Sequence, residues 1–456
     1  MKKNIMILGA AMMLLSSCGI YNKYQRPEDI NVDGLYGENI VIEDTTSIAS
    51  LSWRELFTDP YLVALIDSAL TNNTDYLAAE QQIEEARAML SAARLSYLPS
   101  LALAPNGSVS SFDGSPATWS YQAIANASWQ LDLFGSKLNA NRKAKMSYEI
   151  SKEYKQAVAT SLVANVANIY YTLLMLDEQY RIVGETVESW HEILRTMRAM
   201  KSAGMVNETS IAQMEGSCRA TEAQLLSLKQ SLVETQNAMC RILARTPGKI
   251  ERGKLSDQTF SAKVSVGVPM QLLSLRPDVR MAEYSLATAV YATNAARSAF
   301  YPAVTLSGTV GWTNAAGSVV VNPGKILLNA AASLVQPIFQ NGQLVAQLKV
   351  AKGKQGEAKL SFQQTLLNAG IEVNNALSAV QIARESTLVR EQQVKSMETA
   401  FKGTKLLMQN SSTTYLEVLT AQQSYLSAQI SLVGDKVEEI KRIIELYQAL
   451  GGGRMD

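Results

Sequence analysis

The sequence contains one histidine and three cysteines, and its charges nearly cancel, with 42 basic against 41 acidic residues. This balance leaves no excess of positive charge of the kind that binds nucleic acid. The histidine, His191, lies between Trp190 and Glu192 in a predicted helix, where a packed or solvated residue is favoured over a catalytic base. The sequence has no zinc-ligand spacing, phosphate loop, nucleophile elbow or dinucleotide fingerprint. We therefore expect no catalytic residue, no metal site and no enzyme activity.

Long hydrophobic runs are also lacking. Apart from the N-terminal segment, no apolar stretch reaches the roughly 18 residues that a transmembrane helix needs. Any passage through a membrane must therefore use the strands of a closed barrel, which satisfy every backbone hydrogen bond between neighbours.

The cysteines have separate explanations. Cys218 and Cys240 fall on one predicted helix, about six turns apart, and cannot reach each other to form a disulfide. Cys218 lies on the apolar stripe of that helix, so a buried small hydrophobic residue is favoured over a redox role. Cys18 belongs instead to the N-terminal export segment.

The N-terminus has the pattern of a bacterial secretory signal at residues 1–17. Lys2 and Lys3 precede an apolar run that is too short to span a bilayer, and the run ends in a Leu-Ser-Ser-Cys sequence at Cys18. This sequence is similar to a lipobox, in which the signal is removed and the cysteine is acylated. The alternative is an ordinary signal with a chance cysteine. We expect a covalent lipid on Cys18, no other cofactor, and a lipidated extended arm over residues 18–57.

The chain contains an internal repeat. The segment 92–103 aligns with 295–306, which pairs Tyr97 with Phe300 and Pro99 with Pro302. A period of about two hundred residues indicates a duplicated unit of domain size rather than a solenoid. We assign repeat 1 to residues 58–245, a linker to 246–268, repeat 2 to 269–450 and a C-terminal tail to 451–456.

Each repeat is predicted to begin with a helix, and in repeat 1 this helix runs from about 60 to 97, with Asp59 as its N-cap and Pro60 at its first position. Each repeat also has a very long helix, at about 135–203 and 341–409, and a return helix, at about 208–245 and 414–450. Apolar residues recur in the long helices at strict three-four spacing, which predicts coiled-coil packing. The positions are Ala159, Leu162, Val166, Ile169, Leu173, Leu176, Tyr180 and Val183 in the first copy, and Phe362, Leu366, Ala369, Val373, Ala376, Val380 and Ala383 in the second.

Between the first and the long helix, each repeat is predicted to form one β-hairpin, at about 100–133 and 302–339. Apolar and polar residues alternate along these segments, and Ile124 alone breaks the pattern in its strand. Such alternation is typical of barrel strands between lipid and water. A soluble antiparallel sheet with one buried face remains an alternative.

Two hairpins supply four strands, which cannot close a barrel without leaving edges in the membrane. Three chains would supply twelve strands, which is within the range of closed barrels. We therefore predict a mostly α-helical protein with a membrane β-barrel portion, built as a homotrimer. Its 12-stranded barrel would continue into a long α-helical barrel.

Several motifs carry a family resemblance. They are the lipobox at Cys18, the segment 24–27, WRELFTDPYL at 53–62, the first helix with Asn73, Asp75 and Ala79, RPDVRMAE at 276–283 and YLEVLTAQ at 415–422. With these motifs the chain resembles the TolC-like outer membrane efflux proteins, the outer-membrane factors of tripartite efflux pumps, and in particular their NodT/OprM-like lipoprotein branch. Asp278, at the start of a helix, is expected to have an architectural role as a cap or first-turn acid.

The resemblance implies a passive exit duct for small molecules such as drugs or toxic compounds. It implies an outer-membrane, lipid-anchored location with a large periplasmic portion, and a periplasmic adaptor and an inner-membrane RND-type pump as partners. Type I protein secretion and a structural periplasmic coiled-coil lipoprotein are the alternatives.

The resemblance also implies a set of site residues. The adaptor-contact tip would be formed by Gly204, Met205, Val206, Asn207, Gln409, Asn410, Ser411, Ser412 and Thr413. Relatives often carry acidic gates near this tip, whereas this sequence has Lys402 and Lys405, so we predict a neutral or basic constriction. Tyr97, Pro99, Phe300 and Pro302 would mark the joints between helix and barrel.

Overall fold

The computed structural model describes residues 23–27, 52–258, 276–313, 326–410 and 413–452. Two compact units make up the chain. One contains residues 81–153 and 280–365, and the other contains residues 154–279 and 366–456 together with the segment 32–80. Each unit therefore takes segments from both predicted repeats. The boundaries of the two compact units therefore differ from the boundaries of the predicted sequence repeats.

The N-terminal helices are α2 (Trp53–Leu56), α3 (Pro60–Asn72) and α4 (Thr74–Leu95). The short helix α2 lies within the segment predicted to be extended. The single helix expected at 60–97 is interrupted at Asn73, which is a correction to the prediction. The Asn73 side-chain oxygen accepts hydrogen bonds from the backbone N–H groups of Asp75 (3.0 Å) and Tyr76 (3.1 Å), so it caps a new helix. Its amide also donates to the carbonyl of Ile242 (2.9 Å) and so fixes the break against the end of another helix.

Asp59 caps α3 as the sequence predicts, since its carboxylate accepts from the backbone N–H of Tyr61 at 2.9 Å. The same carboxylate accepts from the hydroxyl of Tyr170 (2.5 Å) and the amide of Gln258 (2.7 Å). Burial, and next the hydrogen bond to Asp59, raise the pKa of Tyr170. Tyr170 therefore stays protonated and donates to the cap at neutral pH.

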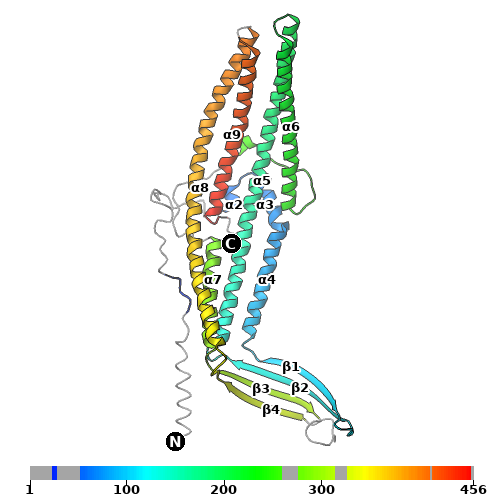
Figure 1. Cartoon of the computed structure of the whole chain (residues 1–456), viewed down its shortest axis with the longest axis vertical. Helices are drawn as coiled ribbons and strands as arrows, with labels where there is room; N and C mark the ends of the chain where they lie inside the picture. The colour runs from blue at the N-terminus through cyan, green and yellow to red at the C-terminus, as the bar shows by residue number, and fades with distance from the viewer. Residues whose placement is uncertain (1–22, 28–51, 259–275, 314–325, 411–412, 453–456) are drawn as a thin grey trace. The chain divides into compact units, whose positions relative to one another are not determined.

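The longest helices form two antiparallel pairs (Figure 1). Helix α5 (Ser136–Ser202, 67 residues) is followed by α6 (Glu208–Ile242, 35 residues), and α8 (Gln343–Gln409, 67 residues) by α9 (Tyr415–Ala449, 35 residues). Most of the predicted three-four positions are buried. They include Ala159, Leu162, Val166, Leu173, Leu176 and Val183 in α5, and Phe362, Leu366, Ala369, Val373, Ala376 and Val380 in α8.

One helix in the described part of the chain, α5, has the length and composition to cross a membrane. Its most apolar 18-residue window has a mean hydropathy of 1.3, which corrects the expectation that no such stretch exists. However, 61% of that window is buried inside the fold. Packing of these apolar residues within the protein therefore accounts for the apolar composition of α5.

The strands β1 (Ser100–Ser110), β2 (Thr118–Leu131), β3 (Ala303–Thr313) and β4 (Ile326–Val335) form one antiparallel sheet in the order β1-β2-β3-β4. Strand β2 of the first copy pairs with β3 of the second, so the two hairpins join into a single sheet (Figure 1). The pairing register places alternate residues of all four strands on the same face of the sheet. One face carries the large apolar side chains, among them Leu101, Leu103, Val109, Trp119, Tyr121, Trp129, Leu306, Val310, Trp312, Ile326, Leu328 and Leu334.

The opposite face of the sheet is polar. Asn126 pairs with Thr309, which pairs with Asn329 on the next strand. Ile124, the exception to the alternation, lies on this face between two small residues, Ala104 and Gly311. Its side chain thus meets small neighbours on both adjoining strands, which explains how it is accommodated there.

Candidate functional site

The turn between α5 and α6 is built by Gly204 and Asn207. Gly204 has φ +76°, a left-handed conformation that favours glycine, and its N–H donates to the carbonyl of Lys201 at 2.8 Å. Asn207 then caps α6, because its side-chain oxygen accepts from the N–H of Ser210 at 2.9 Å. Between them Met205 is exposed, whereas Val206 packs against the apolar core below. The turn therefore presents one large apolar side chain to solvent.

The turn between α8 and α9 is described only in part, since Ser411 and Ser412 lie outside the described residues. Gln409 ends α8, and the N–H of Asn410 donates to the carbonyl of Leu406 at 3.2 Å. Thr413, on the other side of the gap, hydrogen-bonds through its hydroxyl to the carboxylate of Glu417 in the first turn of α9.

The two helical hairpins, α5–α6 and α8–α9, meet in one apolar cluster, which we call the hairpin core. It contains Trp190, Ile193, Leu194, Met197, Ile211, Met214, Cys218, Met408, Val418 and Leu419. Trp190 is fully buried, and its indole N–H donates to the hydroxyl of Thr221 at 3.1 Å. Above the core, the hydroxyl of Tyr415 donates to the amide oxygen of Gln213 at 3.0 Å. Residues of all four helices, together with Val206 of the first turn, are thus held in one packed structure.

Both lysines predicted to form a gate are ion-paired. The ammonium of Lys402 lies 2.6 Å from the carboxylate of Glu398, one turn earlier on α8. The ammonium of Lys405 lies 3.7 Å from the carboxylate of Glu192 on α5. Neither partner was predicted from the sequence: Glu398 lies four residues before Lys402 on α8, and Glu192 belongs to the other repeat. Each positive charge is balanced, which favours the neutral form of the predicted constriction.

The predicted joints contain matching hydrogen bonds at the end of each repeat's first helix. The carbonyl of Tyr97 accepts from the indole N–H of Trp129 in β2 at 2.7 Å. The carbonyl of the corresponding Phe300 accepts from the amide of Gln336, just after β4, at 3.0 Å. Pro99 and Pro302 come two residues after these carbonyls and directly precede the first residues of β1 and β3. In both copies a side chain from the sheet therefore holds the carbonyl at which the chain leaves its helix.

The RPDVRMAE motif at 276–283 contains the start of helix α7 (Pro277–Ser298) and has an architectural arrangement. Arg276 is buried and donates to the carboxylates of Asp278 (2.7 Å) and Glu372 (2.6 Å) and to the carbonyl of Ala449 (2.6 Å). Its pKa is raised, because hydrogen bonds and the charges of these carboxylates outweigh the burial that opposes it. The guanidinium ties the start of α7 to α8 and to the end of α9.

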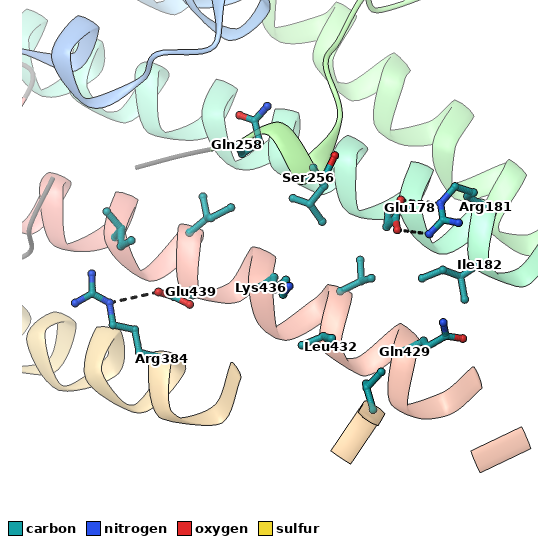
Figure 2. A pocket seen from close by; sticks show the side chains of 15 residues that line it. Glu178, Arg181, Ile182, Ser256, Gln258, Arg384, Gln429, Leu432, Lys436 and Glu439 are labelled. Carbon is teal, nitrogen blue, oxygen red and sulfur yellow. Dashed lines mark hydrogen bonds and ion pairs between the residues drawn. The ribbon is translucent and has the colours of Figure 1, made fainter. Parts of the chain in front are cut away.

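A cavity of about 590 Å³ lies among α5, α8, α9 and the short 3₁₀ helix η3 (Leu255–Asp257). Figure 2 shows two ion pairs among its charged lining residues. Arg181 pairs with Glu178, and Arg384 with Glu439 at 3.3 Å. The Arg384–Glu439 pair joins α8 to α9, whereas Arg181 and Glu178 both lie on α5.

Comparisons with known proteins match nearly the full length of the chain to outer-membrane efflux proteins. The family model for outer membrane efflux proteins matches residues 65–245 and 268–452. The chain is 28% identical over 446 residues to the cation efflux system protein CusC of Escherichia coli O6:H1, covering 97% of each chain. It is 27% identical over 458 residues to the solvent efflux pump outer membrane protein SrpC of Pseudomonas putida, again covering 97% of each.

The fold is that of a solved channel. The structure matches the open state of the Neisseria gonorrhoeae MtrE outer membrane channel with a TM-score of 0.86 and 27% identity, covering 96% of this chain and 98% of that one. These findings confirm the resemblance, the efflux function and the outer-membrane location that the sequence motifs predicted. The chain belongs to the outer membrane efflux protein family.

Proposed function

We propose that the chain is one third of a trimeric exit duct that passively conducts small molecules across the outer membrane. The observation that carries the proposal is the four-stranded sheet. Its apolar face is open to the surroundings, with Leu101 79% and Leu328 78% exposed. Its outer strands β1 and β4 each have a neighbour on one side only, within the described residues.

A trimer would pair the open edges of this sheet and would place its apolar face against lipid. Pairing β4 of one chain with β1 of the next would close a barrel of twelve strands and remove the open edges. The apolar side chains would then face lipid and the polar face would line the lumen, as in other closed membrane barrels. A soluble sheet of this kind would instead need a covering layer over its apolar face.

The turns at the ends of the two helical hairpins are the proposed contact sites for partner proteins. The residues at Gly204–Asn207 and Gln409–Thr413 would contact a periplasmic adaptor, which would connect the duct to an inner-membrane RND-type pump. The family consists of transport channels, so energy for export would come from that pump. Exposed Met205 is a suitable apolar contact for an adaptor helix.

The cargo would be set by the pump. Two relatives at nearly equal identity, 28% and 27%, are named for cation efflux and for solvent efflux. Similarity of the duct therefore does not select a substrate. Small-molecule efflux remains the proposal and type I protein secretion the alternative. Adaptor and RND-pump genes beside this one would support efflux, and a secreted protein gene in their place would contradict it.

Reversing the charge of the gate lysines should change ion selectivity. We expect the purified trimer to conduct with weak ion selectivity in planar bilayers, because Lys402 and Lys405 are balanced by Glu398 and Glu192. The Lys402→Glu, Lys405→Glu double variant leaves four carboxylates together and should become clearly cation-selective. The measurement is the reversal potential under a salt gradient.

The matched control carries the same charge change elsewhere. Lys229, exposed on α6, and Lys249, in the loop after it, are both replaced by Glu, and selectivity should stay as in the unaltered protein. Strong cation selectivity of the unaltered duct that the gate variant leaves unchanged would contradict a neutral constriction at these lysines.

We also propose that Cys18, which lies outside the described residues, carries the lipid anchor. A Cys18→Ala protein with a cleavable export signal should lose labelling by radioactive palmitate but remain in the outer-membrane fraction, because the barrel itself holds the protein in the bilayer. Fractionation after carbonate washing measures this. Release of the variant into the soluble periplasm would argue for the structural lipoprotein in place of the barrel.

A further inference from the structure

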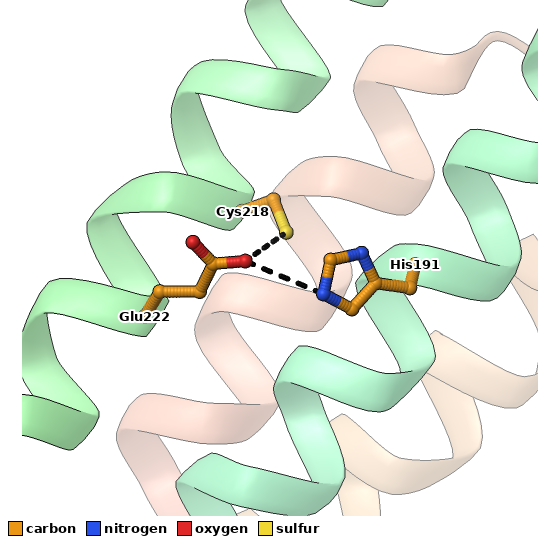
Figure 3. A group of neighbouring side chains, drawn as sticks. All are labelled: His191, Cys218 and Glu222. Carbon is orange, nitrogen blue, oxygen red and sulfur yellow. Dashed lines mark hydrogen bonds and ion pairs between the residues drawn. The ribbon is translucent and has the colours of Figure 1, made fainter.

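Three potential metal ligands meet between α5 and α6, beside the hairpin core. Figure 3 shows His191 of α5 facing Cys218 and Glu222 of α6. The His191 Nε2 lies 3.3 Å from Glu222 Oε1, and the Cys218 Sγ lies 3.8 Å from the same oxygen. The ligand atoms of all three side chains lie within 4.8 Å of one another.

Two of these separations, 3.3 and 3.8 Å, are those of atoms that share a metal ion, and the third is within 4.8 Å. Bond lengths of about 2.0 Å to nitrogen or oxygen and about 2.3 Å to sulfur place the ligands of a tetrahedral zinc roughly 3 to 4 Å apart. Cys218 and Glu222 are one helical turn apart and so project from the same face of α6. His191 approaches that face from the neighbouring helix, and only small side-chain movements would bring all three onto one ion.

We propose that His191, Cys218 and Glu222 form a site for one divalent transition-metal cation of the Zn²⁺ class. Imidazole, thiolate and carboxylate are the three donor types that Zn²⁺ accepts, and water would occupy its fourth position. Binding breaks the S–H bond of Cys218, forms a metal–sulfur bond and releases the proton to solvent. Thiolate and carboxylate together balance the two positive charges of the ion.

The surroundings suit such a site. Cys218 is only 2% exposed and belongs to the hairpin core, whereas the side chain of His191 is 51% exposed, so the ion can enter from the histidine side. Arg219 donates to Glu222 Oε2 at 2.7 Å. It therefore acts as a positioning residue that occupies one carboxylate oxygen and leaves Oε1 directed at the cysteine and histidine.

The site joins two helices that the sequence separates. His191 and Cys218 looked unrelated because each falls on its own helix, and the expected absence of a metal site rested on spacing within short motifs. An ion held there would cross-link α5 to α6 directly beside Trp190 and Met214 of the hairpin core. The inference concerns this link and does not depend on the cargo of the duct.

The test uses the full-length protein in detergent, purified without a histidine tag, stripped of metal by a chelator and kept reduced. Titration with Co²⁺ should produce a near-ultraviolet thiolate-to-cobalt absorption band that saturates at one ion per chain and disappears when Zn²⁺ is added. Zn²⁺ should also raise the melting temperature. Cys218→Ala should abolish the band, and His191→Ala and Glu222→Gln should each weaken binding by at least about tenfold.

Cys240→Ala is the matched control, since Cys240 is equally buried on α6 but outside the cluster, and it should bind as the unaltered protein does. His191→Ala changes an exposed side chain and should fold normally, so it decides the question even if Cys218→Ala does not fold. The absence of a cobalt–thiolate band, or equal binding by the unaltered and His191→Ala proteins, would overturn the proposal.

Discussion

Replacing Gly311 by alanine should prevent the protein from forming a stable membrane-inserted sheet. A Cβ atom on Gly311 would lie 2.2 Å from the carbonyl oxygen of Ala123 and 2.6 Å from the Cα of Ile124. Both are backbone atoms of β2, so no rotation of a side chain can relieve the overlap. The strands would have to separate where the two repeats join, at an expected cost of about 3 kcal/mol or more.

The measurement is the yield of folded protein in the outer-membrane fraction, together with its resistance to denaturant. Gly308→Ala is the control on the same strand, because its Cβ would meet nothing closer than the carbonyl oxygen of Asn329 at 3.7 Å, an ordinary contact. We expect the Gly308 variant to assemble within about 1 kcal/mol of the unaltered protein. Normal assembly of the Gly311 variant would mean that the close approach of β2 and β3 is not required.

The contrast between these glycines illustrates what the sequence could predict. Alternation identified both hairpins and singled out Ile124 as an exception, since each strand reveals its own two faces. It could not predict that β2 pairs with β3, because pairing across the repeats depends on tertiary structure. The reason that Ile124 is tolerated, a glycine opposite it on the other hairpin, is visible only once that register is known.

The helices show the same limit. Three-four spacing predicted α5 and α8 to within a few residues, because a long apolar stripe has one helical solution. The break at Asn73 was missed, since asparagine occurs both within helices and at caps and only its bonds to Tyr76 and Ile242 distinguish the two. Likewise, the sequence predicted neither partner of the gate lysines: Glu398 lies one turn before Lys402 on α8, and Glu192, the partner of Lys405, comes from the other repeat.

Arg276→Leu should lower the stability of the helical unit by about 2 to 4 kcal/mol. Arg276 is 6% exposed and holds three groups through one planar fork: the carboxylates of Asp278 and Glu372 and the carbonyl of Ala449. Leucine fills the space but leaves these acceptors without their donor. Because both carboxylates are about half exposed, water can solvate them in part, so the loss should fall short of that for a fully buried pair.

Thermal unfolding followed by circular dichroism in detergent measures this loss, and two variants sharpen it. Arg276→Lys keeps the charge but not the fork, so it should retain only part of the stability. Arg442→Leu removes an arginine of α9 that also has two carboxylate partners, Glu438 and Glu445, but is 37% exposed, so it should cost less than about 1 kcal/mol. Equal losses from Arg276→Leu and Arg442→Leu would contradict the role of Arg276 as the buried tie between α7, α8 and the end of α9. A loss confined to Arg276 would instead assign the RPDVRMAE motif at 276–283 to the assembly of the duct wall and not to its cargo.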